Sequence, residues 1–202
     1  MQCRQLGTVD YGPTLEAMKA FTQTREEDTD DEIWLLQHPP VYTQGLSGKA
    51  EHVLDVGTIP VIPADRGGQV TYHGPGQWVA YVLYDLRRAN VNVRELVALL
   101  EGSVVNLLSD LGIEAYGDPA ARGVYVEGRK IAALGLKVSR GRSYHGLSLN
   151  VDMDLAPFNG INPCGYAGLE VTSVARELPA GACPALDAVG DALLDHLRRV
   201  LR

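Results

Sequence analysis

The chain has 202 residues, 46% of them hydrophobic and 21% charged, which is typical of a folded globular protein with a substantial core. Its net charge of −7 at pH 7 argues against a protein that binds duplex nucleic acid or a membrane surface, but leaves room for a local basic patch. The N-terminus has no apolar leader and no apolar run reaches 18 residues, so we expect one cytoplasmic domain over residues 1–202.

The N-terminal half predicts one helix and three strands. Pro13 suits the first position of a helix over 13–24, and Leu15, Met18 and Phe21 follow three residues apart. The acidic run that comes next, 26–32, has the composition of a solvated loop. Apolar and β-branched runs predict strands at 33–36, 59–62 and 77–86.

The C-terminal half predicts two long helices around a set of hairpins. Asn92 and Glu95 have the spacing of a capping box at the start of a helix over 92–111, which Gly112 ends. The run Glu127-Gly128-Arg129 predicts a hairpin turn between a strand at 124–126 and one that begins at Lys130. A further strand at 147–151 and a closing helix at 185–201 complete the pattern. Helices flanking short, hairpin-linked strands predict an α+β fold with a mixed, largely antiparallel sheet.

A glycine-rich stretch over 66–77 lies between two predicted strands. Its glycines would let a ligand approach the backbone, while Arg66, Thr71 and His73 could point at polar atoms of that ligand. The alternative is an ordinary surface loop with a solvated arginine. No Gly-Lys-Ser/Thr is present, so the stretch is not a phosphate-binding P-loop.

Lys130 opens a strand of small and apolar residues. A lysine that loses solvent there is a candidate base, although a surface lysine beside a hairpin turn is the more common arrangement. Lys137 follows seven residues later. An odd separation puts the two lysines on opposite faces of an unbroken strand, and a bulge at Gly135 would remove that expectation.

The remaining histidines give no metal-ligand spacing, and we expect no metal and no cofactor. His145 is either a ligand-positioning group or a satisfied core histidine. His38 and His52 are expected in loops, and His196 lies on the closing helix without an evident partner.

Cys164 stands between Pro163 and Gly165, in a run of small residues. Proline fixes φ and glycine lets the chain turn, so the cysteine can present its thiol on a tight loop as a nucleophile. The alternative is a small apolar residue at a turn, because unpaired cysteines are often buried. Cys3 and Cys183 lie far from it in sequence, and no Cys-x-x-Cys predicts a disulfide framework.

Four segments in this order resemble a known family: 66–77, 130–135, 145–150 and 162–168. Together they are similar to the bacterial octanoyltransferases of lipoate biosynthesis. The resemblance runs from about Trp34 to Val174 and implies the fold of the biotin and lipoate protein ligase catalytic domain. It implies transfer of octanoyl from octanoyl-acyl carrier protein to a lysine of a lipoyl domain, such as a glycine-cleavage H protein or a dehydrogenase E2 subunit, without ATP.

By the same matching, Cys164 would form the acyl thioester and Lys130 would activate it. The segments that would contact substrate are Arg66, Gly67, Gly68, Gln69, Val70, Thr71, Tyr72 and His73, then Ala133, Leu134 and Gly135, then Gly146, Leu147 and Ser148. Two alternatives remain: an ATP-dependent lipoate or biotin ligase, which would leave Cys164 without a task, and a binder of acyl carrier protein without catalysis.

The densest basic stretch runs from Arg129 to Arg142, with no acidic residue inside it. Acyl carrier proteins are strongly acidic. We therefore expect Arg140 and Arg142 to lie beside the mouth of the site and to steer the carrier toward it.

Overall fold

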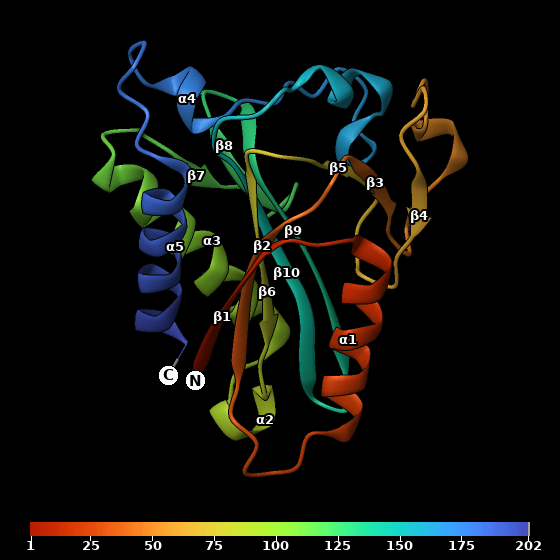
Figure 1. Ribbon diagram of the computed structural model, residues 1–202, viewed down its shortest axis with the longest axis vertical. Helices are drawn as coiled ribbons and strands as arrows, with labels where there is room; N and C mark the ends of the chain where they lie inside the picture. Colours follow the sequence, from red (N-terminus) through yellow and green to blue (C-terminus); the bar gives the residue numbers. More distant parts are fainter. Residues whose placement is uncertain (202) are drawn as a thin grey trace.

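The computed structural model describes residues 1–201, and its centre is a seven-stranded sheet with strand order β1-β2-β6-β10-β9-β8-β7 (Figure 1). Every neighbouring pair is antiparallel except β1 and β2, which run parallel. The strands are β1 (Gln2–Thr8), β2 (Glu32–Gln37), β6 (Gln77–Leu83), β7 (Tyr116–Gly117), β8 (Gly123–Val126), β9 (Arg129–Ser139) and β10 (Arg142–Asn150). The α+β fold with a mixed, largely antiparallel sheet is confirmed.

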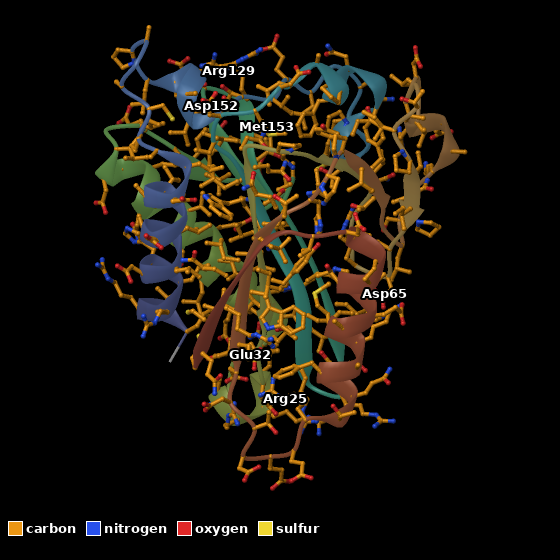
Figure 2. The ribbon with its side chains drawn as sticks, in the orientation of Figure 1. Arg25, Glu32, Asp65, Arg129, Asp152 and Met153 are labelled. Atoms are coloured by element: carbon orange, nitrogen blue, oxygen red, sulfur yellow. The ribbon has the colours of Figure 1, made fainter. Side chains whose placement is uncertain are left out.

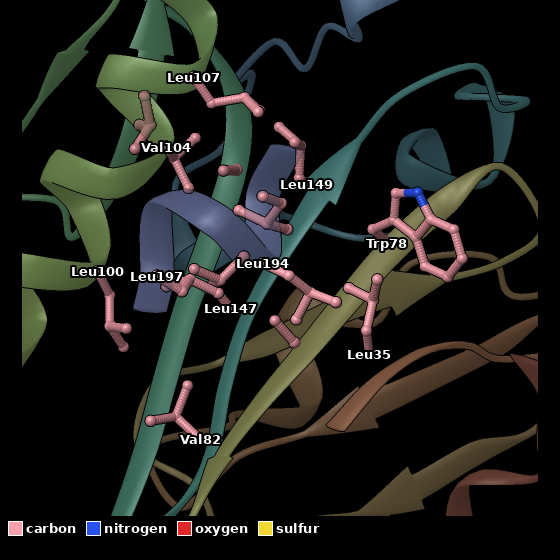
Figure 3. Packing of buried hydrophobic residues seen from close by; sticks show 14 of the residues in the cluster. Leu35, Trp78, Val82, Leu100, Val104, Leu107, Leu147, Leu149, Leu194 and Leu197 are labelled. Carbon is pink, nitrogen blue, oxygen red and sulfur yellow. The ribbon is translucent and has the colours of Figure 1, made fainter. Parts of the chain in front are cut away.

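Helices cover both faces of this sheet. On one face lie α3 (Val93–Asp110) and α5 (Leu186–Val200), and on the other lies α1 (Tyr11–Thr24) (Figure 1). Figure 3 shows leucines of α3 and α5 meeting Leu147 and Leu149 of β10 on the first face. Two short helices, α2 (Leu86–Ala89) and α4 (Val174–Glu177), lie at opposite ends of the sheet.

A second sheet of three strands, ordered β4-β3-β5, lies beside α1 at the end of the molecule where α4 lies (Figure 1). It consists of β3 (Val41–Gln44), β4 (Val61–Pro63) and β5 (Val70–His73). Three short 3₁₀ segments pack near this sheet: η1 (Ala50–His52), η2 (Ala156–Gly160) and η3 (Pro163–Gly165). Phe158 of η2 and Val53, next to η1, belong to its hydrophobic core, and η3 contacts β5. Because η3 carries Cys164, this small sheet helps to place that residue.

The local signals of the long elements hold. The Asn92 side chain accepts from the backbone N–H of Glu95 while the Glu95 carboxylate accepts from that of Asn92, so the capping box is present. The predicted hairpin turn forms, with φ of 47° at Glu127 and 83° at Gly128. The helices α1 and α5 match the predicted spans within two residues.

Short strands and one hairpin were not predicted. The sequence analysis did not include β1, β3, β5 or the turn at Arg140–Gly141 that joins β9 to β10, and it ended β6 three residues late. The strand predicted at 59–62 begins only at Val61. Three- and four-residue strands show too little alternation to be distinguished from loops.

The acidic run after α1 is not simply solvated, which corrects one expectation. Asp31 is buried and pairs with Arg25 at 2.7 Å and with Arg88 at 2.7 Å. His38 lies in a loop as expected, directly after β2, whereas His196 has a partner that the sequence did not indicate. His38 is fully buried, with Nδ1 2.6 Å from the Val9 carbonyl oxygen, and His196 lies 2.9 Å from Asp110.

The expectation for Arg140 and Arg142 is wrong. They lie at the β9–β10 turn, whereas Lys130 lies at the other end of β9, about 30 Å away at roughly 3.3 Å per residue. Arg142 pairs with Asp85 and donates to the Arg25 carbonyl oxygen. Figure 2 shows Arg25, the partner of Arg142, and Arg129, the neighbour of Lys130, at opposite ends of the molecule. Arg140 and Arg142 therefore cannot steer a carrier to Lys130.

Candidate active site

The Nζ of Lys130 lies 2.8 Å from the Sγ of Cys164, although 34 residues separate them in sequence. Lys130 is buried, and Cys164 has φ of 57° and ψ of 15°, the left-handed conformation that non-glycine residues seldom adopt. Backbone bonds fix this arrangement, because Lys130 N donates to the Glu170 oxygen and Lys130 O accepts from Thr172 N. The segment after the Cys164 loop is thus bound along the start of β9.

A bulge in β9 decides which way Lys130 faces. In the β8–β9 pair, Val124 lies opposite Ala132 but Tyr125 lies opposite Lys130, so Ile131 is an extra residue in β9. Ile131 and Ala132 both pack into the α3–α5 core. Lys130 therefore points to the opposite face, as a single inserted residue reverses the alternation.

This bulge overturns the expectation for the two lysines. Lys137 is paired with Tyr144, which packs on the α1 face of the sheet. Lys130 and Lys137 thus share a face, with the bulge at Ile131 rather than at Gly135, where pairing with Gly146 is regular.

Three further groups hold Lys130 in place. Its Nζ donates to the Arg122 carbonyl oxygen at 3.0 Å and lies 5.1 Å from the centre of the Tyr125 ring. Gly123 allows the close approach, since a Cβ there would stand 2.8 Å from Cε of Lys130. Behind it, the buried Glu101 of α3 accepts from Gly123 N at 3.1 Å and pairs with Arg122 at 3.4 Å.

The charge of Cys164 keeps Lys130 protonated. Burial is the largest single influence on the Lys130 pKa and lowers it, but the Cys164 thiolate, its hydrogen bond and Tyr125 together outweigh burial and raise the pKa above its ordinary value. The geometry is therefore that of a buried lysine held beside a half-buried cysteine, and this contact favours the protonated form of Lys130.

A narrow pocket of about 50 Å³ extends from Cys164 between β10, β9 and β5. Twelve of the fourteen residues expected to contact substrate line it: Arg66, Gly68, Gln69, Val70, Thr71, His73, Ala133, Leu134, Gly135, Gly146, Leu147 and Ser148. The other two do not. Tyr72 points into the core of the small sheet, and Gly67 donates its N–H to the Leu136 oxygen.

The sequence analysis missed three residues of this pocket, namely Tyr11, Val79 and Tyr81. Tyr11 begins α1, and Val79 and Tyr81 alternate on one face of β6. The alternation was readable in the sequence, but nothing indicated that this face of β6 borders a cavity instead of core.

His145, left open by the sequence, lines the pocket and is buried. Burial lowers its pKa to about 4, so it is neutral at pH 7 and its Nε2 donates to Asp65 at 2.8 Å. Its Nδ1 then faces inward without a hydrogen-bond partner, and so does the hydroxyl of Tyr11, whose pKa burial raises to about 12. The end of the pocket away from Cys164 therefore has a polar rim.

Arg66 adds a buried guanidinium to the wall. It donates to the backbone oxygen of Thr43 at 2.6 Å and to the Thr43 hydroxyl at 2.8 Å. Gly135 lies against the stem of Arg66, because a Cβ on residue 135 would stand 3.0 Å from Cδ of Arg66. No carboxylate of residues 1–201 forms an ion pair with Arg66, so its charge is available to a polar group in the pocket.

His73 is a buried residue of the pocket wall. Burial and the nearby His38 lower its pKa to about 3, and it donates from Nδ1 to Gln77 at 2.7 Å. Gln77 in turn donates to Asn150 at 2.9 Å. This neutral network fixes the wall, and Arg66 is the cationic side chain that lines the pocket.

The sequence matches the family model of the lipoyl protein ligase A/B catalytic domain over residues 10–198. It is 60% identical over 195 residues to an octanoyltransferase of Ectopseudomonas mendocina, covering 96% of this chain and 94% of that one. It is 56% identical over 197 residues to an octanoyltransferase of Laribacter hongkongensis, covering 98% and 94%.

Solved structures share the fold at much lower identity. A bipartite lipoate protein ligase of Thermoplasma acidophilum, studied with its E2 lipoyl domain, superposes with a TM-score of 0.76 at 17% identity, over all of this chain and 84% of that one. A biotin protein ligase of Aquifex aeolicus gives 0.61 at 13% identity, over all of this chain and 68% of that one. The fold predicted from the resemblance is therefore the one observed.

Proposed function

The chain belongs to the octanoyltransferases of the lipoyl protein ligase A/B catalytic domain family, and from this premise we propose that it carries octanoyl through a thioester on Cys164. It is an acyltransferase of protein lipoylation. The observation that carries the thioester proposal is the 2.8 Å contact between Lys130 and Cys164, which lines a narrow pocket. The donor in this proposal is octanoyl-acyl carrier protein.

In the first half of the reaction the Cys164 thiolate attacks the thioester carbonyl carbon of the donor. The bond from that carbon to the donor sulfur breaks as the bond to Sγ forms. The departing donor thiolate takes a proton from the Lys130 ammonium and leaves as a thiol. Cys164 is then acylated and Lys130 neutral, so no charge is left unpaired in the site.

Acylation changes the balance at Lys130. The thiolate that raised its pKa is consumed, and the burial that lowers its pKa remains. Lys130 is thus set up as a general base for the second half. The neutral amine of the acceptor lysine attacks the acyl carbon, Lys130 accepts its proton, and the Cys164 thiolate leaves. The ammonium–thiolate pair is restored and an amide is formed.

The glycine-rich wall would hold the chain and its carbonyl. Arg66 has no ion-pair partner within residues 1–201, and Gln69 lies beside the Cys164 loop, with its Nε2 3.0 Å from where a Cβ of Gly165 would stand. Hydrogen-bond donors placed where an oxyanion develops typically contribute a few kcal/mol to catalysis. We assign the substrate-contacting role to the twelve expected residues that line the pocket and to Tyr11, Val79 and Tyr81, which line it as well.

The acceptor in this proposal is a lipoyl domain, such as an H protein or an E2 subunit. The Thermoplasma ligase that shares the fold was studied with such a domain. Residues 1–202 would form one catalytic domain. None of the helices within residues 1–201 combines the length and apolar character needed to cross a bilayer.

The test is an intact-mass measurement after mixing the enzyme with octanoyl-acyl carrier protein in the absence of ATP. We expect one octanoyl adduct on the unaltered enzyme, which a lipoyl domain removes, and none on Cys164→Ala. A Cys3→Ala, Cys183→Ala double variant should still be acylated. A strict need for ATP would point to a ligase instead, and no adduct under any condition would point to a binder of the carrier.

A further inference from the structure

A second and much larger cavity lies on the other side of the Cys164 loop. It is an open groove of about 680 Å³ lined by residues of η2, η3 and α4. Figure 1 shows α4 at one end of the large sheet. The lining of the groove is more polar than apolar: Leu54 is exposed, whereas Leu155, Phe158 and Ile161 also line it but are themselves buried. None of the residues expected to contact substrate belongs to it.

A small void lies between the groove and the reacting atoms. This void of about 10 Å³ is lined by Lys130 and Cys164 and shares Phe158, Pro163 and Val171 with the groove. The same void shares Thr71, Ala133 and Ser148 with the acyl pocket. Cys164 therefore lines both the narrow pocket and the small void that borders the wide groove.

This arrangement separates the two ends of a thioester. When the acyl chain of a donor fills the pocket and its carbonyl carbon meets Sγ of Cys164, the sulfur side of that donor must extend away from the pocket. The groove is the cavity that continues from Cys164 in that direction, and it is large enough for a long, thin substituent.

We propose that this groove binds the phosphopantetheine arm through which the donor carrier protein holds its octanoyl group. The proposal rests on the proposed function. Such an arm alternates short apolar segments with amides and ends in a phosphodiester. The exposed Leu54 suits the methyl and methylene groups, and the polar lining, with the exposed amide of Asn159, suits the amides of the arm.

Arg176 is the group that fits the phosphodiester. It lines the groove, is exposed and has no ion-pair partner within residues 1–201. The groove's other arginine, Arg129, is held by Glu127 at 2.9 Å and Glu177 at 3.1 Å. Asp154 and Glu170 also line the groove, so the attraction for phosphate is confined to Arg176 and does not extend over the whole surface.

The groove is tested by filling it without touching Cys164 or Lys130. Asn159→Trp should slow acylation of Cys164 by octanoyl-acyl carrier protein at least about tenfold. Alkylation of Cys164 by iodoacetamide, which is small enough to bypass the groove, should stay unchanged. The matched control is Asn106→Trp, on the exposed side of α3 away from the groove, which should acylate at the rate of the unaltered enzyme.

The phosphodiester contact is tested with two small donors, octanoyl-phosphopantetheine and octanoyl-pantetheine. Arg176→Ala should raise KM about two- to fivefold for the phosphorylated donor, the range of an exposed ion pair, and leave KM for the other donor unchanged. Arg199→Ala, an exposed arginine of α5, is the control and should change neither.

Each outcome decides something distinct. Normal acylation of Asn159→Trp would show that the arm approaches by another route and overturn the proposal. If Asn159→Trp accepts the donor normally but transfers poorly to a lipoyl domain, the groove belongs to the acceptor and the proposal is again overturned. If Arg176→Ala changed KM equally for both small donors, Arg176 would not contact the phosphodiester. Failure of the unaltered enzyme to form any thioester would instead contradict the proposed function.

Discussion

Lys130 and Cys164 are each costly to bury alone and are stable only together. The buried ammonium of Lys130 loses hydration, and the contact of 2.8 Å with the half-buried Cys164 offsets part of that loss. The contact also explains why β9 is bulged at Ile131: without the extra residue, Lys130 would point into the leucine-rich core between the sheet and α3. The chemistry of one residue thus depends on an insertion beside it.

Replacing Lys130 by methionine should lower the rate at which iodoacetamide alkylates Cys164 at pH 7 by about tenfold, because an ammonium at this distance stabilises the thiolate by at least 1 to 2 kcal/mol at an effective dielectric constant near 20. Lys137→Met is the matched control, since Lys137 lies on the same strand and face but farther away. Equal alkylation rates in both variants would contradict the ion pair.

Glu101 should act on the reaction through Lys130. Its carboxylate holds the backbone of Gly123 and the side chain of Arg122, whose carbonyl oxygen accepts from Lys130. We expect Glu101→Ala to reduce kcat about tenfold with little change in KM, and Glu101→Gln to recover part of the loss because an amide oxygen still accepts from Gly123.

The control for this prediction is Glu95→Ala, which removes the cap of the same helix and should lower stability by about 1 kcal/mol without affecting kcat. If Glu101→Gln and Glu101→Ala were equally impaired, or if only KM rose, the route through Arg122 and Gly123 would be wrong.

At the scale of elements, the backbone at Gly123 permits the approach of β8 to Lys130. Its φ is 148°, and a Cβ would stand 2.8 Å from both the Ala132 oxygen and Cε of Lys130. Gly123→Ala should therefore displace Lys130, abolish most activity and lower stability by about 1 to 3 kcal/mol. Gly102→Ala in α3, where a Cβ meets nothing within 4 Å, should retain activity and slightly raise the melting temperature. An active Gly123→Ala enzyme would show that β8 does not constrain the lysine.

The length of the pocket sets the preferred chain. Ser148, which shares a void with Cys164, and His145 at the polar end are three residues apart on β10, or about 10 Å. An extended octanoyl chain, with seven C–C bonds of about 1.5 Å in zigzag, spans about 9 Å. Each methylene buried adds about 0.8 kcal/mol until the chain meets Tyr11 and His145.

Octanoyl donors should therefore give a higher kcat/KM than hexanoyl donors, by about fourfold per methylene, and also exceed dodecanoyl donors, which would press against the polar end. Tyr11→Ala should move the optimum toward longer chains. The measurement is kcat/KM over donors of six to twelve carbons. A profile that is flat, or unmoved by Tyr11→Ala, would place the chain elsewhere.

The elements that sequence reasoning found are those whose signal is local. The capping box of α3, the Glu127–Gly128 turn and the apolar face of α5 are each complete within a few residues. What it missed depends on tertiary packing. The strand β5 lies inside the glycine-rich stretch, and its burial is decided by pairing with β3. The bulge at Ile131 is visible only as a mismatch between two paired strands.

The candidate site was found for a different reason: chemically specific residues stand in short, ordered segments. Cys164 and Lys130 drew notice as residue types in unusual surroundings, but their 2.8 Å contact could not follow from a separation of 34 residues. Arg140 and Arg142 show the opposite failure. They were close to Lys130 in sequence, yet an eleven-residue strand carries them to the far end of the sheet.

At the scale of the whole molecule, the sheet divides two unlike interiors. The α3–α5 face is an apolar core, whereas the α1 face encloses the pocket together with buried polar groups. Three histidines, His38, His73 and His145, lie on that second side, and burial lowers the pKa of each. The α1 side of the sheet, which encloses the pocket, therefore packs around three histidines that are neutral in the folded protein.

These histidines should make stability depend on pH. His145 and His73 have pKa values of about 4 and 3 in the folded protein, against 6.5 in the unfolded chain. As the pH falls below 6.5, the unfolded chain therefore binds more protons than the folded protein. Stability is therefore lost on acidification by up to about 1.4 kcal/mol per pH unit for each histidine, down to about pH 4 for His145 and pH 3 for His73. The carboxyls of Asp65 and Asp85, with pKa values below their ordinary range, add a loss only at lower pH.

The melting temperature of the unaltered protein should thus begin to fall between pH 6.5 and 4, before its carboxylates are protonated. His145→Asn removes one of the three buried imidazoles and keeps a residue type that tolerates the left-handed φ of 60° at this position. The variant should be less stable at pH 8, where it loses the bond to Asp65, but its stability should decline less steeply between pH 6.5 and 4. Melting curves of the two proteins at matched pH values make the comparison. Parallel declines would mean that His145 is already protonated in the folded protein, and that its Nδ1 donates a proton into the pocket instead of facing it as a bare acceptor.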